Sequence, residues 1–123
     1  MRNYVDAAWP ALTSLGLAKT ASRDKLTFTP DLKGAVSKAD LVQENGPERP
    51  DFKIKLFADM DAATPPQSII ASSSSGITMS VMQSACKHPE RCVIGHPFNP
   101  PHLMPLVEVV GGAKTSPETI EWP

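Results

Sequence analysis

Residues 92–108 read CVIGHPFNPPHLMPLVE, and this stretch decides the fold and the candidate site. It opens with a short apolar run typical of a buried strand, and His96 stands where that strand is expected to end. Prolines at 97, 100, 101 and 105 then interrupt regular structure, because proline lacks a backbone donor and restrains its predecessor. A returning apolar run, residues 106–110, carries one carboxylate, Glu108. A histidine and an acid so placed form a candidate general-base pair, although a loop histidine and a solvent-facing glutamate would show the same spacing.

Apolar periodicity predicts alternating helices and strands along the rest of the chain. Helices are expected over residues 4–17, 31–38, 47–63 and 78–85, and strands over 26–28, 39–43 and 68–72. Asp31 is the expected N-cap of the second helix. The third helix is expected to bury an apolar face made of Phe52, Ile54, Leu56, Phe57 and Met60. The alternation predicts one α/β domain over residues 1–123, with a mainly parallel sheet and helices on both faces.

Four consecutive serines, Ser72 to Ser75, follow the strand expected at 68–72. Serines before a helix start are first of all turn and capping residues, because their hydroxyls bond nearby backbone groups. The alternative is a hydroxyl that donates to a substrate oxygen, since ligands of open α/β sheets bind beyond the carboxyl ends of the strands. The residues alone leave both interpretations open.

Bulk properties exclude several classes of protein. With 12 basic and 13 acidic residues, the chain has no charge footprint for nucleic acid or a membrane surface, and no apolar run approaches the ~20 residues of a membrane span. Cys86 and Cys92 are close enough in sequence to form a disulfide, but the absence of a recognisable secretion signal favours reduced thiols in the cytoplasm. The spacing of His88, His96 and His102 matches no metal-ligand motif, so no metal is expected.

The segment GHPFNPP followed by LVEVV resembles the signature of the NAD-dependent 3-hydroxyacyl-CoA dehydrogenase family, which includes carnitine and gulonate dehydrogenase branches. The resemblance continues through ADLVQENGPER, FKIKLFADMD and IIASSSSGITMS and covers roughly residues 25–120. It implies a Rossmann-like fold and an oxidoreductase that transfers a hydride from a 3-hydroxy substrate to NAD. The carbon that loses the hydride becomes the carbonyl carbon of a ketone.

The resemblance also assigns roles by position. His96 aligns with the catalytic base, Glu108 with its carboxylate partner, and Ser75 with a serine that bonds the substrate oxygen beside the cofactor. Glu48, Lys53 and Asn99 align with residues that contact the nicotinamide half of NAD. From the residues alone, Lys53 is equally well a solvated lysine on an amphipathic helix, and Asn99 a capping side chain in a proline-flanked turn.

Departures from the family pattern limit these expectations. The glycines, at 16, 34, 46, 76, 95, 111 and 112, form no GxGxxG phosphate loop, so an incomplete Rossmann-like domain with weak NAD binding and little turnover is expected. The chain is expected to begin after the family's phosphate loop and to stop before its helical second domain. Pro97 stands where the fatty-acyl branch usually carries Phe, which favours L-carnitine or another 3-hydroxy acid over the acyl-CoA of fatty acid metabolism.

Two further hypotheses remain beside the dehydrogenase. One is a catalytically silent binding or assembly module that lacks the cofactor loop, and the other, disfavoured by the histidine spacing, is a metal hydrolase. If the family's central strand is missing, the strands expected at 26–28 and 39–43 lose their ladder partners. Unpaired strand edges favour pairing with another chain, so a homodimer is expected.

Overall fold

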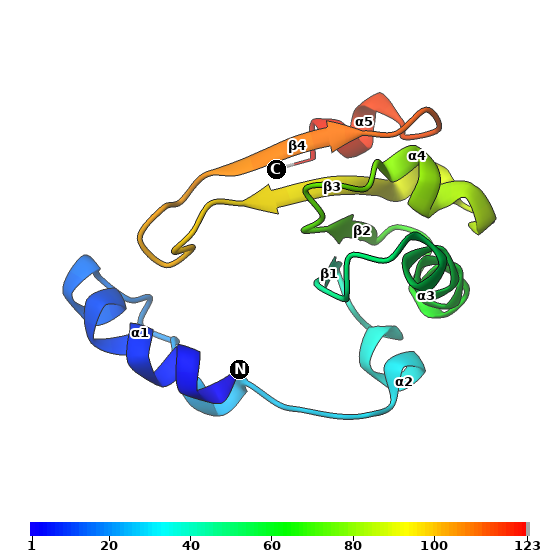
Figure 1. The fold of residues 1–123 in the computed structure, drawn as a ribbon. Coiled ribbons are helices and arrows are strands. Elements are labelled where there is room, and N and C mark those ends of the chain that lie inside the picture. The colour runs from blue at the N-terminus through cyan, green and yellow to red at the C-terminus, as the bar shows by residue number, and fades with distance from the viewer. Residues whose placement is uncertain (123) are drawn as a thin grey trace.

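The computed structural model describes residues 1–122 and contains a four-stranded sheet in the order β1-β2-β3-β4 (Figure 1). β1 (Leu41–Glu44), β2 (Ile69–Ser72) and β3 (Cys92–Pro97) run parallel to one another. β4 (Val107–Gly111) returns antiparallel to β3, as the proline-interrupted segment between them predicted. The expected α/β class with a mainly parallel sheet is confirmed.

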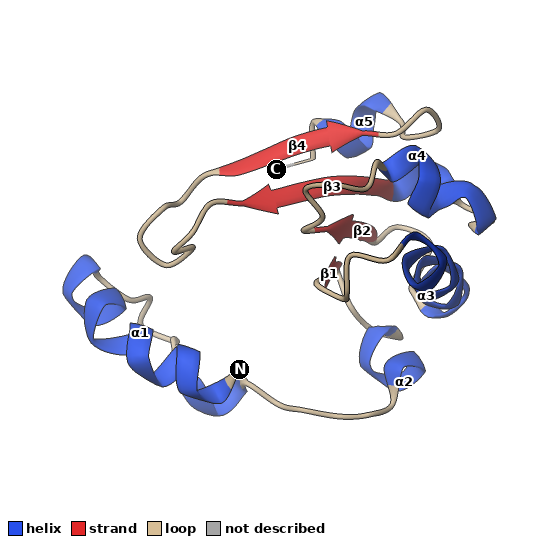
Figure 2. Ribbon diagram, viewed as in Figure 1, coloured by secondary structure: helices blue, strands red, loops and turns tan. Residues whose placement is uncertain are grey.

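Within residues 1–122, five α-helices accompany the sheet, and Figure 2 distinguishes the helices from the strands by colour. They are α1 (Arg2–Leu15), α2 (Leu32–Val36), α3 (Pro50–Ala63), α4 (Met79–Met82) and α5 (Pro117–Ile120). Asp31 caps α2 as expected, because its carboxylate accepts a hydrogen bond from the backbone N–H of Gly34 at 3.1 Å. None of the helices within residues 1–122 has the length and apolar character needed to cross a membrane.

The two faces of the sheet are covered unequally. Helices α3 and α4 cover one face, where the main core cluster consists of Phe57, Met60, Ile70, Met79, Met82, Cys92 and Ile94. The opposite face holds a smaller cluster of Ile69, Ala71 and Val93. Trp122 and Thr119 of the C-terminal segment line the hollow beside that cluster, and Leu41, Val107 and Val109 in the same hollow stay about half exposed. Both faces of the sheet are therefore covered, as expected, but the face opposite α3 and α4 is covered only by the short C-terminal segment.

Helix α1 stands apart from the sheet (Figure 1). Its helical spacing was predicted correctly, with Pro10 inside the helix, yet none of its residues is buried. It ends at Gly16, whose φ of 104° is a conformation that side-chain-bearing residues rarely adopt. It approaches the rest of the chain at a hollow against residues 99–102 and through Asp6, which pairs with Arg23 at 3.3 Å.

Two predictions about these elements were wrong. Residues 26–28 form no strand, and Phe28 is exposed, because a strand needs a ladder partner that no described residue supplies there. Helix α3 begins at Pro50 rather than residue 47, and its buried face differs from the expected one: Phe52 is 41% exposed, whereas Lys53 is fully buried. The charge of Lys53 is balanced by Glu44 and Glu48, which precede the helix, and a count of apolar spacing within the helix does not detect them.

A buried ion pair fastens the end of α3 to the start of β3. The guanidinium of Arg91 donates to the carboxylate of Asp61 at 2.9 and 3.2 Å, to the Asp61 carbonyl at 2.7 Å and to the Thr64 carbonyl at 3.3 Å. It also bonds the carbonyl of Pro65. These carbonyls belong to the last turn of α3 and the residues after it, where helical partners run out. Arg91 therefore serves as a C-terminal cap for α3.

We expect this pair to make the fold sensitive to acid. Burial raises the pKa of Asp61, but the hydrogen bonds from Arg91 and from the amides of His88 and Lys87 outweigh it, so the net pKa lies below the ordinary 3.8. A carboxyl whose folded pKa is depressed stabilises the fold above its unfolded pKa, and that stabilisation is lost as the pH falls through the folded value. Urea unfolding at pH 7, 5, 4 and 3 should show a stability loss that begins near pH 4.

The control is Asp61→Asn, which keeps the shape of the side chain and removes the titration. This variant should be less stable at pH 7 and should lose less stability between pH 5 and pH 3 than the parent chain. Equal losses in both chains over that range would show that other carboxyls cause the acid sensitivity.

Candidate functional site

A cavity of about 400 Å³ opens where the carboxyl ends of the parallel strands meet the start of β4. This volume is in the range of small-molecule sites. The side chains predicted to catalyse, Ser75, His96 and Glu108, all line it. The remaining lining comes from residues 74 and 76–80, from Ile94 on β3, and from Val110 and Gly111 on β4. The structure thus brings together three residues that lie up to 33 positions apart in sequence.

His96 and Glu108 are directly opposite each other in the β3–β4 ladder. Cross-strand partners point to the same face of a sheet, so the two side chains meet above it. Nδ1 of His96 lies 3.9 Å from Oε2 of Glu108, within ion-pair range and about 1 Å longer than a hydrogen bond. The predicted proximity is observed, whereas a closed hydrogen bond is not.

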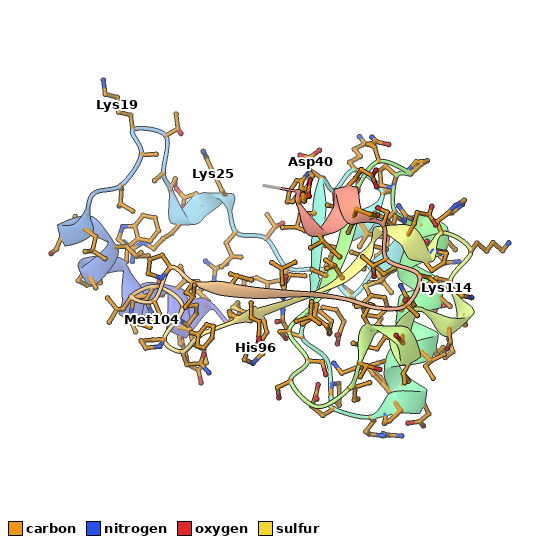
Figure 3. All side chains as sticks on the ribbon, turned by 90° about the horizontal axis from the view of Figure 1, so that it is seen from above. Lys19, Lys25, Asp40, His96, Met104 and Lys114 are labelled. Carbon is orange, nitrogen blue, oxygen red and sulfur yellow. The ribbon has the colours of Figure 1, made fainter. Side chains whose placement is uncertain are left out.

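The surroundings of His96 fix its orientation. Its Nδ1 atom is shielded from solvent and has no hydrogen-bond partner among the described residues. The ring of Phe98 meets the imidazole edge-on, with 5.8 Å between the ring centroids. Figure 3 shows the side chain of His96 on the sheet between the loop that carries Met104 and the helical part of the molecule. Because the Nδ1 side faces Glu108, the other ring nitrogen, Nε2, is left for a ligand.

The serine run has the turn chemistry that the sequence predicted. The hydroxyl of Ser72 donates to the Glu44 carboxylate, that of Ser73 to the Glu44 carbonyl, and that of Ser74 accepts from the amide of Ile77. Ser75 is the member of the run whose side chain is not used in such a bond, and it lines the cavity. The capping interpretation therefore holds for three serines, and the substrate interpretation stays a prediction for Ser75.

The residues predicted to contact the nicotinamide half lie in three different settings. Glu48 is half exposed beside the serine run, where its carboxylate accepts from the hydroxyl of Ser74 at 2.9 Å and the amide of Gly76 at 3.3 Å. Lys53 is buried beneath Glu48, with its ammonium 3.3 Å from that carboxylate. Asn99 is not part of the cavity and lines the separate hollow against α1, just before a cis peptide bond to Pro100.

Glu44 is a residue of this region that sequence analysis missed. It lies at the carboxyl end of β1, is only 3% exposed, and holds Lys53 Nζ at 2.7 Å. The available signal was a charged residue directly after an apolar strand, followed nine positions later by a lysine at helical spacing from the apolar Phe57 and Met60. Among residues 1–122, no three His, Cys, Asp or Glu side chains cluster as metal ligands do.

Sequence comparison identifies relatives over nearly the whole chain. The sequence profile of the 3-hydroxyacyl-CoA dehydrogenase NAD binding domain matches residues 3–122. The chain is 55% identical to L-carnitine dehydrogenase of Streptomyces coelicolor over 122 residues, which is 99% of this chain and 38% of that protein. It is 52% identical to L-carnitine dehydrogenase of Pseudomonas putida, over 98% of this chain and 38% of that protein. The chain thus spans less than two fifths of the length of these relatives.

Solved structures show the same fold. An NAD+-dependent dismutase, 5-formyl-3-hydroxy-2-methylpyridine 4-carboxylic acid 5-dehydrogenase, superposes with a TM-score of 0.86 at 39% identity, over 98% of this chain and 39% of that one. The 3-hydroxybutyryl-CoA dehydrogenase of Escherichia coli superposes with a TM-score of 0.78 at 32% identity, over 95% of this chain and 26% of that one. The profile match over residues 3–122 and these likenesses agree, and the chain belongs to the 3-hydroxyacyl-CoA dehydrogenase family through its NAD-binding domain.

Proposed function

We propose that this chain forms the nicotinamide side of a site that oxidises a 3-hydroxy group to a ketone. The observation that carries the proposal is the convergence of Ser75, His96 and Glu108 on one cavity of about 400 Å³ at the carboxyl edge of the sheet. NAD, the cofactor of this family's domain, would accept the hydride when bound. The chain's own residues orient the hydroxyl and remove its proton.

The proposed proton path follows from the orientation of His96. Ser75 bonds the substrate oxygen, and Nε2 of His96 takes the hydroxyl proton as the adjacent carbon gives up its hydride. The imidazolium that results is stabilised by the negative charge of Glu108, 3.9 Å from Nδ1. The proton then passes to solvent, because the His96 side chain remains 30% exposed.

We propose L-carnitine or another 3-hydroxy acid as the substrate, with a 3-hydroxyacyl-CoA of fatty acid metabolism as the alternative. The names of the relatives at 55% and 52% identity support the first. Pro97 at the outer end of β3, immediately after His96, is the local departure from the fatty-acyl pattern. We also propose a reducing compartment such as the cytoplasm, in which Cys86 and Cys92 would remain free thiols.

Nicotinamide mononucleotide carries the nicotinamide half of the cofactor, and ADP carries the adenosine with a pyrophosphate, so the pair tests the proposed site. In an NMR titration of the full chain, the first should shift the amide signals of Ser75, Gly76 and His96, because these residues line the cavity. ADP should leave the same signals in place, because no GxGxxG loop is present to hold a pyrophosphate. Equal responses to both ligands, or shifts confined to other residues, would contradict the proposal and favour a silent binding module.

The missing phosphate loop also bears on the affinity for whole NAD. We expect calorimetry to show binding weaker than micromolar, because contacts to the pyrophosphate anchor a dinucleotide and the serine run lies at the other half of the site. A micromolar dissociation constant for the purified chain would show that another element binds the phosphates.

We also propose that the chain forms a homodimer through the outer edge of β1. That edge has no ladder partner among the described residues, and Leu41 on β1 is about half exposed. An open edge next to apolar surface favours strand pairing with a second copy, and a net charge of −1 offers little repulsion. Light scattering at micromolar concentration should give twice the monomer mass of 13.2 kDa, and a stable monomer would refute the dimer.

A further inference from the structure

Lys53 is fully buried, although it was expected to contact a cofactor or solvent. Its ammonium donates to the two carboxylate oxygens of Glu44 at 2.7 and 2.9 Å and to the carbonyl of Gly46 at 3.1 Å. A lysine ammonium has three donors, so these bonds and the 3.3 Å approach to Glu48 use its full capacity. Lys53 therefore has no donor left for a ligand in this arrangement.

Glu44 is equally committed. Besides Lys53, its carboxylate accepts from the amide of Gly46 and from the hydroxyl of Ser72, both at 2.5 Å. The side chains of Glu44 and Lys53 are each only 1% exposed. A buried ion pair of this kind is weak grounds for a role in stability, because the loss of hydration offsets much of the attraction between the charges. The alternative is that the pair positions other residues, and the contacts around it support this role.

Glu48 connects this buried pair to the cavity. One carboxylate oxygen lies 3.3 Å from Lys53 Nζ, and the other accepts from the hydroxyl of Ser74 and the amide of Gly76. The two residues that Glu48 holds in this way are the immediate neighbours of Ser75. All three line the cavity that also contains His96 and Glu108.

We propose that Glu44 and Lys53 are positioning residues, which hold the Glu48 carboxylate against residues 74 and 76 and so fix the hydroxyl of Ser75 at the cavity. That the Ser75 hydroxyl binds the substrate rests on the proposed function. The contacts by which Glu48 holds residues 74 and 76 do not depend on it. Lys53 thereby acts on Ser75 through Glu48. Glu44 supplies the counter-charge for the buried ammonium, 2.7 Å from Lys53 Nζ.

The pKa of Glu48 is a measure of the contacts that hold its carboxylate against residues 74 and 76. Its slight burial raises the pKa, but the hydrogen bonds from Ser74 and Gly76, together with the nearby positive charge of Lys53, bring the net value below the ordinary 4.5. The charged groups that face Glu48 are Lys53 from α3 and, behind that ammonium, Glu44 from β1. Ser74 contributes the largest of the lowering interactions, so it offers a test that leaves the buried charges untouched.

The first test replaces Ser74 by alanine and follows the Glu48 carboxyl carbon by NMR as a function of pH. The pKa of Glu48 should rise toward 4.5, and the amide signals of Ser75 and Gly76 should shift and lose rigidity on the nanosecond timescale. Ser74→Thr keeps the hydroxyl and should restore both readouts, which a purely structural defect at this position would not predict. If Ser74→Ala leaves the pKa and the Ser75 signals unchanged, the hold does not exist.

The second test removes the buried charges together. Glu44→Gln combined with Lys53→Met keeps the side-chain volumes similar and leaves no lone charge in the core, so folding should survive. The pKa of Glu48 should again rise and Ser75 should become more mobile, whereas Lys55→Met, on the exposed side of the same helix, should change neither. A folded double variant with a rigid Ser75 and an unchanged Glu48 would overturn the roles of Glu44 and Lys53.

These readouts need no cofactor, so they separate two kinds of failure. A chain in which the Glu48 hold is confirmed, but which binds no nicotinamide mononucleotide, would refute the proposed function and leave the positioning contacts established. A chain that binds the nucleotide at Ser75 and shows no dependence on Ser74 or Lys53 would refute the positioning inference alone.

Discussion

Replacing Arg91 by alanine is expected to lower the free energy of unfolding by about 3–5 kcal/mol, because it leaves Asp61 as an uncompensated buried charge. The same change strips the carbonyls of Asp61 and Thr64 of their donors at the end of α3. The free energy of unfolding of a small domain is only about 5–15 kcal/mol, so a loss of this size removes a large part of it. Urea unfolding followed by circular dichroism gives the measurement.

Two other arginine variants test the cause of the Arg91 effect. Arg49 makes an exposed ion pair with Asp51, and Arg49→Ala should cost less than about 1 kcal/mol. Arg91→Lys keeps the charge but loses the planar fork that reaches Asp61 and the helix carbonyls at once, so its stability should fall between those of the parent and the alanine variant. A loss below about 1 kcal/mol in Arg91→Ala would show that the buried pair contributes little.

If His96 is the general base as proposed, replacing it by asparagine should slow hydride transfer from L-carnitine, the proposed substrate, to NAD by about 10²–10⁴-fold, the usual contribution of a general base. Asparagine is similar in size and polarity but takes no proton, so the cavity should keep its shape. The parent rate is itself expected to be low without a phosphate loop. Absorbance at 340 nm should therefore be followed for hours at high protein and cofactor concentrations.

The matched control is His88→Asn. His88 is exposed and lies just before β3, whereas His96 lies near the far end of that strand. We expect this control to keep the parent rate. A His96→Asn chain that works as fast as the parent would exclude His96 as the base, and equal losses in both histidine variants would indicate damage to the fold and not to the chemistry.

The candidate site was predictable in part because its signals are local. The apolar run before His96, the prolines after it and the apolar run around Glu108 predict two strands joined by a stiff loop, and the ladder places the two side chains opposite each other. Apolar spacing alone does not say which residue of one strand lies opposite which residue of the other, because the register depends on which faces are buried. The family resemblance, and not the spacing, selected Ser75 from a run of four similar serines.

The environment of Lys53 shows what local patterns leave open. Its neighbours in sequence suggested an amphipathic helix with Phe52 inside, whereas the structure buries Lys53 and leaves Phe52 partly exposed. The difference comes from Glu44, which β1 delivers to the same point from nine residues earlier. A buried lysine requires a counter-charge, and the presence of one depends on how strands and helices pack.

The sequence by itself determined the α/β class, most of the helices and strands, and the segment on which His96 and Glu108 lie, because periodicity and proline act over a few residues. Tertiary structure alone decided that residues 26–28 form no strand, that α1 stays apart from the core, and that Glu44 and Lys53 pair beneath Glu48. A strand needs a ladder partner, and a buried charge needs an opposite one. These partners lie on other elements of the fold, so their positions follow from packing and not from local pattern.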